Sequence, residues 1–277
     1  MWLILLSAWD WEPSIVVGCL AMLGIYAASV RFHFTKKSLY FAGGVLVLLL
    51  ALVSPLDTLG DDYLFSAHML QHLLLALVIP ALLLLGIPAE VGKRVMAYRW
   101  TRVIERGIGR PPVSWIIGVG AMAVWHIPPL FNAALASEPL HIAQHLCFLL
   151  TGTIFWWPVL SPVEERRIPR VPWAAAYLVS ACLGCTIIGV LITFARPGLY
   201  PAYFAPEDEL GILPLIRNGW GITAAADQQA GGIIMWTVGC MIYFFSTIRM
   251  FILWLDNASA ANESAQSPEL APARKTL

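Results

Sequence analysis

Charge is scarce in this chain. Charged residues make up 12% of its 277 positions and hydrophobic residues 59%, whereas soluble domains carry roughly 25% charged residues. This shortage excludes an ordinary soluble domain and predicts an integral membrane protein. The formal net charge of zero says little about partners, because the placement of Lys and Arg matters more than their sum in a membrane protein. Nothing in the sequence suggests nucleic-acid binding.

Cysteine is also scarce, and the motifs of several enzyme classes are absent. The five cysteines lie in apolar runs rather than in polar loops, so we expect small buried side chains and no secreted disulfide framework. The chain has no Gly-rich phosphate loop, no C-x-x-C-H haem-attachment motif and no identifiable Ser/His/Asp arrangement. The sequence therefore offers no motif of these enzyme classes, and our leading hypothesis is a protein that is not an enzyme. The cysteines are Cys19, Cys147, Cys182, Cys185 and Cys240.

Long apolar stretches are what the sequence has in abundance. Each is close to the length of about 20 residues that crosses a hydrocarbon core, and in lipid such unalternating runs must be helices. We predict an all-α integral membrane protein, a bundle of seven transmembrane helices forming one domain over residues 1–256. A disordered cytoplasmic tail, 257–277, follows it. The predicted spans are 13–30, 39–53, 63–87, 112–131, 139–160, 172–194 and 228–255.

The basic residues predict the orientation of this bundle. All but two of the 17 Lys and Arg residues fall at one side of the predicted membrane, the exceptions being Arg196 and Arg217. The positive-inside rule then places the N-terminus outside and the C-terminus inside. The basic loop 89–111 is either a topology signal or an interfacial helix lying on anionic lipid at the inner surface.

Five of the six histidines fall near the outer ends of three predicted spans. Four of them form two His-x-x-x-His pairs, and an i, i+4 spacing places both members on one helical face. Ionisable side chains inside a bilayer are expensive, so the cluster is a candidate functional site. His33 lies in the inner basic loop and is not part of the set. The predicted site histidines are His68, His72, His126, His141 and His145.

Two polar residues open the seventh span at the same predicted depth as the histidines. Asp227 could orient an imidazole or coordinate a metal directly, and it could equally cap its own helix. Gln228 follows it. For the histidines themselves, the competing interpretation is hydrogen bonding between helices, which averages only about 0.6 kcal/mol per bond.

The histidines alone do not identify the metal, because imidazole binds zinc, copper, iron and nickel. Cys182 and Cys185 share a face near mid-membrane on the sixth span, and Cys240 and Met241 lie at a comparable depth on the seventh. These four could form a deeper relay for Cu(I), although inert packing is the other reading. Haem is the chemical rival, since two histidines on opposing helices can supply both axial ligands.

Five segments together resemble the CtaG family of cytochrome c oxidase assembly factors, the seven-helix kind. The resemblance covers nearly the whole predicted membrane region, and every histidine position of the family's pattern, with its Asp-Gln pair at Asp227 and Gln228, is intact. The segments are SAHMLQHLLLALVIPALLLLGIP at 66–88, WHIP at 125–128, HIAQHLCFLLTGTIFWWPVL at 141–160, LYPAYF at 199–204 and DQQAGGIIMW at 227–236.

The resemblance implies a multi-pass protein of the bacterial plasma (inner) membrane that helps to mature haem–copper oxidases by supplying copper. Its expected partners are oxidase subunits and a periplasmic copper chaperone. The family's metal-binding positions correspond to the five site histidines, and the connector that contains 199–204 is expected to cover them. Two other hypotheses use the same residues: a haem-binding redox or haem-handling membrane protein, and a metal-free assembly scaffold.

Overall fold

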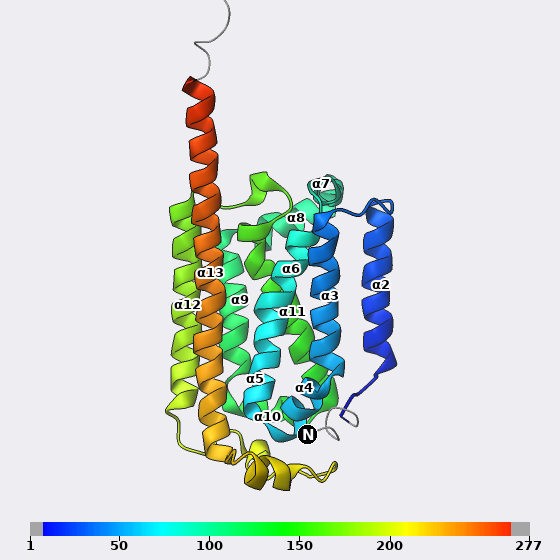
Figure 1. Ribbon diagram of the computed structural model, residues 1–277, viewed down its shortest axis with the longest axis vertical. Helices are drawn as coiled ribbons and strands as arrows, with labels where there is room; N and C mark the ends of the chain where they lie inside the picture. Colours follow the sequence, from blue (N-terminus) through cyan, green and yellow to red (C-terminus); the bar gives the residue numbers. More distant parts are fainter. Residues whose placement is uncertain (1–7, 267–277) are drawn as a thin grey trace, which may run out of the picture.

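Every element of regular structure in the described part of the chain is helical. The computed structural model describes residues 8–266, and its long helices run side by side along one axis (Figure 1). This confirms the predicted all-α architecture. The long helices are α2 (Pro13–Ser29), α3 (Lys36–Val53), α9 (Pro111–Trp125), α11 (Glu138–Leu160), α12 (Val171–Thr193) and α13 (Ala224–Gln266).

A span assembled from three pieces lies at the centre of the bundle. In the apolar segment Phe65–Gly86, 67% of an 18-residue apolar stretch is buried inside the bundle. The corresponding stretches of the other four long spans are 39% buried or less. Pro80 lacks an N–H and crowds the carbonyl four residues earlier, and a π-helical turn accommodates this break. The pieces are α5 (Phe65–Leu73), the π-turn η2 (Leu74–Val78) and α6 (Ile79–Gly86).

The number of membrane crossings depends on one bent helix pair and one shorter helix. Five helices are long and apolar enough to cross a membrane, and a bent pair would make a sixth. The apolar helix α2 has 17 residues. These helices fit a multi-pass membrane protein, and a count of seven requires both α2 and the bent pair to cross.

The bent pair corrects the predicted fourth span, which we expect as one helix over 112–131. Helix α9 ends at Trp125, and α10 (Pro128–Leu135) begins after a bend of 72°. The cause is local, because a residue before proline is pushed out of the α region and Ile127 is extended. His126 therefore lies at a helix end.

Shorter elements lie at the two ends of the bundle. We call the end that carries α4, η1 and α10 the histidine end, because α5 starts there (Figure 1). Helices α7 and α8 lie at the opposite end, and their sequence holds much of the basic loop 89–111. The elements are α4 (Pro55–Thr58), η1 (Leu59–Tyr63), α7 (Ala89–Ala97), α8 (Arg99–Ile108), η3 (Glu164–Arg166), η4 (Pro201–Tyr203) and η5 (Leu215–Gly219).

Helix α13 continues beyond the other helices (Figure 1). It ends at Gln266, so residues 257–266 are helical rather than the disordered start of a tail. Four of these ten residues are Ala, the residue with the highest helix propensity, which favours the extension of the helix. The rest of the predicted tail, 267–277, and residues 1–7 of the predicted domain lie outside the described residues.

The packing of α12 against α13 depends on two glycines. A Cβ added at Gly232 would lie 2.7 Å from the Thr193 nitrogen and 2.8 Å from the Gly189 oxygen. Both neighbours are backbone atoms and cannot rotate away. The two helices therefore approach closely through small residues, as membrane helices commonly do.

We expect Gly232→Val to lower the stability of the bundle by roughly 1–3 kcal/mol or more, since overpacking forces the helices apart. Thermal unfolding in detergent measures it. Gly43→Val on α3 is the matched control, because a Cβ at Gly43 meets nothing within 4 Å. Equal melting of the two variants would show that the close approach is not needed.

Candidate metal centre

The structure brings the five predicted histidines into one cluster at the histidine end. Ring centroids within the two His-x-x-x-His pairs lie 4.2 Å apart for His68 and His72 and 4.1 Å apart for His141 and His145. The pairs face each other across α5 and α11, with the His68 and His141 rings 5.3 Å apart. His126 joins from the end of α9, 5.4 Å from His72.

Three of these histidines are close enough to share one ion. His68, His141 and His145 each offer a ring nitrogen, and these three atoms lie within 4.8 Å of one another. We call them the histidine triad. His72 and His126 form a second pair beside the triad, and the His72 ring lies 5.7 Å from that of His145. The five imidazoles therefore offer two neighbouring donor sets.

Many of the imidazole nitrogens in the cluster are buried without a hydrogen-bond partner in the described part of the chain. His68 and His72 are 0% and 1% exposed. An unpaired buried polar group costs about 1–3 kcal/mol, so a structure keeps several of them together only if something offsets that cost. A bound ion would do so. The atoms are Nε2 of His126, His141 and His145 and both ring nitrogens of His68 and His72.

Asp61 is the functional neighbour that the sequence reasoning missed. Its Oδ1 lies 3.3 Å from Nδ1 of His68, and its Oδ2 lies 3.5 Å from Nδ1 of His141. A carboxylate on one imidazole nitrogen fixes the ring orientation and leaves the other nitrogen available to a metal. The only signal in the sequence is an acidic run before the third span, Asp57, Asp61 and Asp62.

A hydrogen bond determines which ring nitrogen of His126 remains free for a metal. Its Nδ1 lies 2.6 Å from the Met122 carbonyl oxygen, which can only accept, so Nδ1 carries the proton. The other nitrogen, Nε2, then has a lone pair. The His126 carbonyl in turn accepts from the Tyr200 hydroxyl at 2.9 Å, which fixes the bend between α9 and α10.

Asp227 caps a helix, but not its own. Its carboxylate accepts from the N–H of Phe65 at 2.7 Å and from the N–H and hydroxyl of Ser66 at 3.1 and 2.5 Å. These groups begin α5, the helix of His68 and His72. An acidic group stabilises the positive end of a helix. Asp227 therefore does not cap α13, which is one of the two roles that the sequence leaves open for it, and its described side-chain hydrogen bonds reach the start of the central span rather than an imidazole.

Gln228 holds the connector between α12 and α13. Its Oε1 accepts from the N–H groups of Gly198 and Leu199, both at 3.1 Å, and its Nε2 donates to the Arg196 carbonyl. The side chain is thus used in fixing the loop.

The connector covers the histidine cluster as expected. The Tyr203 hydroxyl donates to the Gly60 carbonyl at 2.8 Å, and the rings of Tyr200 and Phe131 lie 4.3 Å apart. Phe131 lies 5.3 Å from His68. Tyr200, Tyr203 and Phe131 are all almost fully buried. This aromatic cover excludes water from that side of the cluster.

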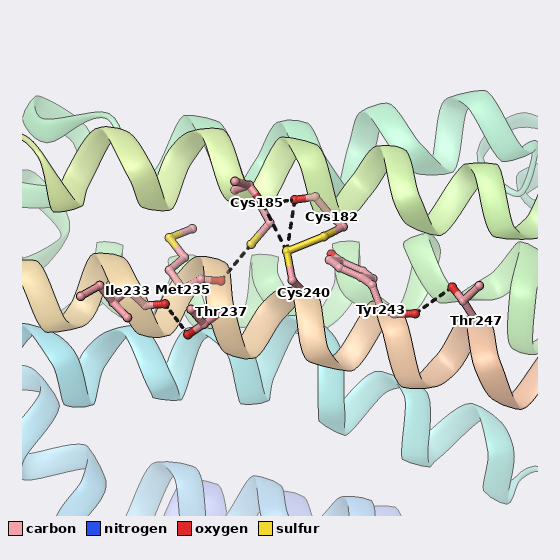
Figure 2. Close-up of a disulfide and its surroundings, with 9 residues drawn as sticks. Cys182, Cys185, Ile233, Met235, Thr237, Cys240, Tyr243 and Thr247 are labelled. Carbon is pink, nitrogen blue, oxygen red and sulfur yellow. Dashed lines mark hydrogen bonds between the residues drawn. A yellow bond between two sulfur atoms is a disulfide. The ribbon is translucent and has the colours of Figure 1, made fainter.

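The structure does not bring the four residues of the predicted Cu(I) relay together as a set of free metal donors. Cys182 and Cys240 are joined in a disulfide between α12 and α13, with Cα atoms 5.1 Å apart (Figure 2). Cys185 donates to the Met235 carbonyl. Met241 is 59% exposed, because adjacent helical residues point about 100° apart and it cannot share the face of Cys240. The reading of all five cysteines as unpaired packing is also wrong for this pair.

The fold and site together define a helical, multi-pass membrane protein with a buried imidazole cluster. The chain belongs to the family described as cytochrome c oxidase caa3 assembly factor (Caa3_CtaG), whose profile matches residues 22–257. All five histidines and Asp61 lie inside that range. The family is one of assembly factors for cytochrome c oxidase.

Two curated relatives come from mycobacteria. An uncharacterized protein of Mycobacterium leprae is 23% identical over 228 residues, covering 76% of this chain and 33% of that protein. An uncharacterized protein of Mycobacterium bovis is 22% identical over 206 residues, covering 69% and 30%. The chain thus spans about a third of the length of the curated relatives it matches. No solved structure matches it.

Proposed function

We propose that this protein binds copper as cargo at the histidine cluster and delivers it to a nascent haem–copper cytochrome c oxidase. The observation that carries the proposal is the histidine triad, three imidazoles from two facing helices with nitrogens within 4.8 Å of one another. Their Nε2 atoms are buried and have no hydrogen-bond partner among residues 8–266. Membership of an oxidase assembly family supports the oxidase as the recipient. Delivery makes no bond in a substrate, so the role is not enzymatic.

The donor set suits an ion that must be released again. Metal–imidazole bonds of roughly 2.0–2.1 Å require the nitrogens of one shell to lie roughly 3.4 Å apart, so the triad nitrogens, which lie within 4.8 Å of one another, must approach by up to about 1.4 Å to bind one ion. A closed four-ligand site holds its metal structurally, whereas three protein ligands leave a position open for exchange. His72 and His126 provide a neighbouring set to which the ion could move.

The membrane arrangement in this proposal has seven crossings, counting α2 and the bent pair α9–α10. The N-terminus lies outside and the C-terminus inside, because the basic α7–α8 region is at the end opposite the histidines. In a bacterial plasma membrane the cluster then faces the periplasm. A periplasmic copper chaperone would load it, and oxidase subunits in the same membrane would receive the ion.

The ring geometry favours an ion over haem. The His68 and His141 rings are nearly parallel, 19° apart, and stack face to face at 5.3 Å. Bis-histidine haem ligation needs the nitrogens, rather than the faces, to point at each other across a porphyrin. Phe148 also lies 4.5 Å from His72, and Phe131 closes the other side.

Metal analysis after purification in mild detergent tests the proposal. Copper in the protein, with no Soret absorption, is the expected result. Iron with a strong Soret band would show instead that the protein binds haem. A folded protein that takes up no metal when offered copper would leave a scaffold role instead.

Asp61→Asn should weaken copper binding by roughly 10–100-fold, the usual cost of removing a carboxylate that orients ligating histidines. The ligands themselves are kept, so the site still fills at high copper. Competition with a chromophoric chelator measures the change in affinity. Asp256→Asn, on the exposed face of α13, is the control. An Asp61→Asn protein with unchanged affinity would mean that Asp61 does not orient the triad.

A further inference from the structure

A cleft of about 700 Å³ opens beside the histidine cluster, between α2 and α11. Its lining includes His141 and His145 of the triad. The opposite wall contains residues of α2, among them Ile15 and Gly18, and Leu48 of α3 contributes to it as well. The cleft therefore connects the surroundings of the bundle with two of the three imidazoles that could hold an ion.

The polar lining of this cleft carries one sign of charge. Six carboxyl groups line it, and no Lys or Arg is among its described lining residues. The remaining walls are mostly apolar, and low-dielectric walls focus the field of charges of one sign and raise the local concentration of counter-ions. The carboxyl groups belong to Asp10, Glu12, Asp57, Asp61, Asp62 and Glu138.

Not all six carboxyl groups are charged at neutral pH. Burial and then the neighbouring Asp61 raise the pKa of Asp57 to about 8, so Asp57 is mainly protonated. Its Oδ1 accepts from Nε2 of Gln71 at 2.5 Å. Burial, followed by Asp61 and Glu209, raises the pKa of Asp62 to about 6, which leaves it mostly ionised at pH 7. Asp57 therefore contributes a hydrogen bond to the wall of the cleft rather than a negative charge.

The acidic lining of the cleft lies beside imidazole nitrogens that have no hydrogen-bond partner in the described part of the chain. Asp61 lines the cleft and also contacts His68, which is fully buried with an unpartnered Nε2. The Nε2 atoms of His141 and His145 likewise have no hydrogen-bond partner among the residues that the structure describes. From the connector side, Tyr200, Tyr203 and Phe131 cover the cluster.

We propose that this acidic cleft is the access route for a hydrated copper ion, which its carboxylates attract and hold weakly before the ion reaches the histidine triad. The inference rests on the proposed copper function. Carboxylates suit harder ions such as Mg²⁺ and Ca²⁺, whereas imidazole suits copper. The ion is therefore passed inward to nitrogen ligands rather than retained at the carboxylates.

A space-filling variant tests the route without touching a ligand or a charge. Gly18 lines the cleft, and a Cβ there meets nothing within 4 Å, so Gly18→Phe would place a ring in the passage. Gly24, on the same helix, is equally open but does not line the cleft, and Gly24→Phe is the matched control. Stopped-flow uptake of hydrated Cu²⁺ by the full chain in detergent, followed with a fluorescent competing chelator, gives the rate constant. We expect Gly18→Phe to be slowed and Gly24→Phe to match the parent.

A charge variant tests the attraction separately. In Glu12→Gln/Asp62→Asn/Glu138→Gln the association rate should fall by roughly tenfold at low ionic strength, the lower range of electrostatic steering. The difference should largely vanish at 1 M salt, where the Debye length is about 3 Å. Glu164→Gln/Glu165→Gln, two exposed carboxylates of η3, is the control and should keep the parent rate.

The results of these experiments distinguish failure of the proposed access route from failure of the proposed copper function. A parent protein that binds no copper overturns the proposed function, and the route with it. A parent that binds copper, with the Gly18 and charge variants equally fast, overturns only the route. A charge variant that also loses copper stoichiometry would make the carboxylates part of the holding site, which contradicts their role as a weak outer station. Slower uptake with full stoichiometry supports the inference.

Discussion

Alanine at both His68 and His141 should abolish stoichiometric copper binding. The double change reduces the triad to one imidazole and removes both contacts to Asp61. The loss of affinity should exceed the roughly 10–100-fold expected for a carboxylate that only orients the ligands. Metal content per folded chain measures this, and oxidase assembly in cells should fail in parallel.

The double variant should remain folded. Removing the two imidazoles leaves a cavity and takes both contacts from the Asp61 carboxylate, but Asp61 lines the open cleft and is 29% exposed, so water can solvate it. His33→Ala is the control, since His33 is exposed and contacts only its own loop at Arg31 in the described structure. Full copper content in the folded double variant would refute the triad as the site.

Asp227→Ala should cause the largest loss of stability among single changes at the histidine end. It leaves the N–H groups of Phe65 and Ser66 without their acceptor, and each unsatisfied buried donor costs about 1–3 kcal/mol. We therefore expect a loss of about 2–5 kcal/mol, seen as a lower melting temperature in detergent. Copper binding should weaken as well, because the start of α5 positions His68.

Two comparisons make the Asp227 result specific. Asp227→Asn keeps one carbonyl acceptor and should fall between the parent and the alanine variant. Asp256→Ala removes a carboxylate from an exposed position on the same helix and should melt with the parent. If Asp227→Ala also melts with the parent, the bonds to α5 do not stabilise it.

The meeting of the five histidines could be predicted because it depends on regular helices. The i, i+4 spacing sets the face within each pair, and the direction of each span sets its depth. Which faces meet is then limited by the expense of leaving imidazoles in lipid. The structure places His126 in the same layer even though its helix ends there, since the bend at Ile127 comes after it.

Asp61 could not be predicted by the same argument. It lies in the π-turn η1, and Leu64 is extended between that turn and α5, so helical spacing does not relate Asp61 to His68. A Cβ at Gly60 would lie 3.0 Å from the His68 backbone nitrogen. This close approach, rather than any sequence period, folds the acidic turn back onto the histidines.

Contacts between segments that are distant in the sequence could not be predicted either. Asp227 caps a helix 162 residues away, and no local pattern distinguishes this from capping α13. The disulfide needs Cys182 and Cys240 on facing sides of α12 and α13, whereas the sequence indicates only a similar depth. The Pro128–Pro129 pair, in contrast, carried a local signal for the bend.

Copper K-edge X-ray absorption of the copper-loaded protein is the sharpest test of copper binding at the histidine triad, because it identifies the ligands of the ion itself. Copper held by the triad should show two or three imidazole nitrogens at about 2 Å, with the outer-shell scattering of the ring, and this signal should be lost in His68→Ala/His141→Ala. A spectrum dominated by sulfur at about 2.3 Å, or one without imidazole scattering, would contradict it.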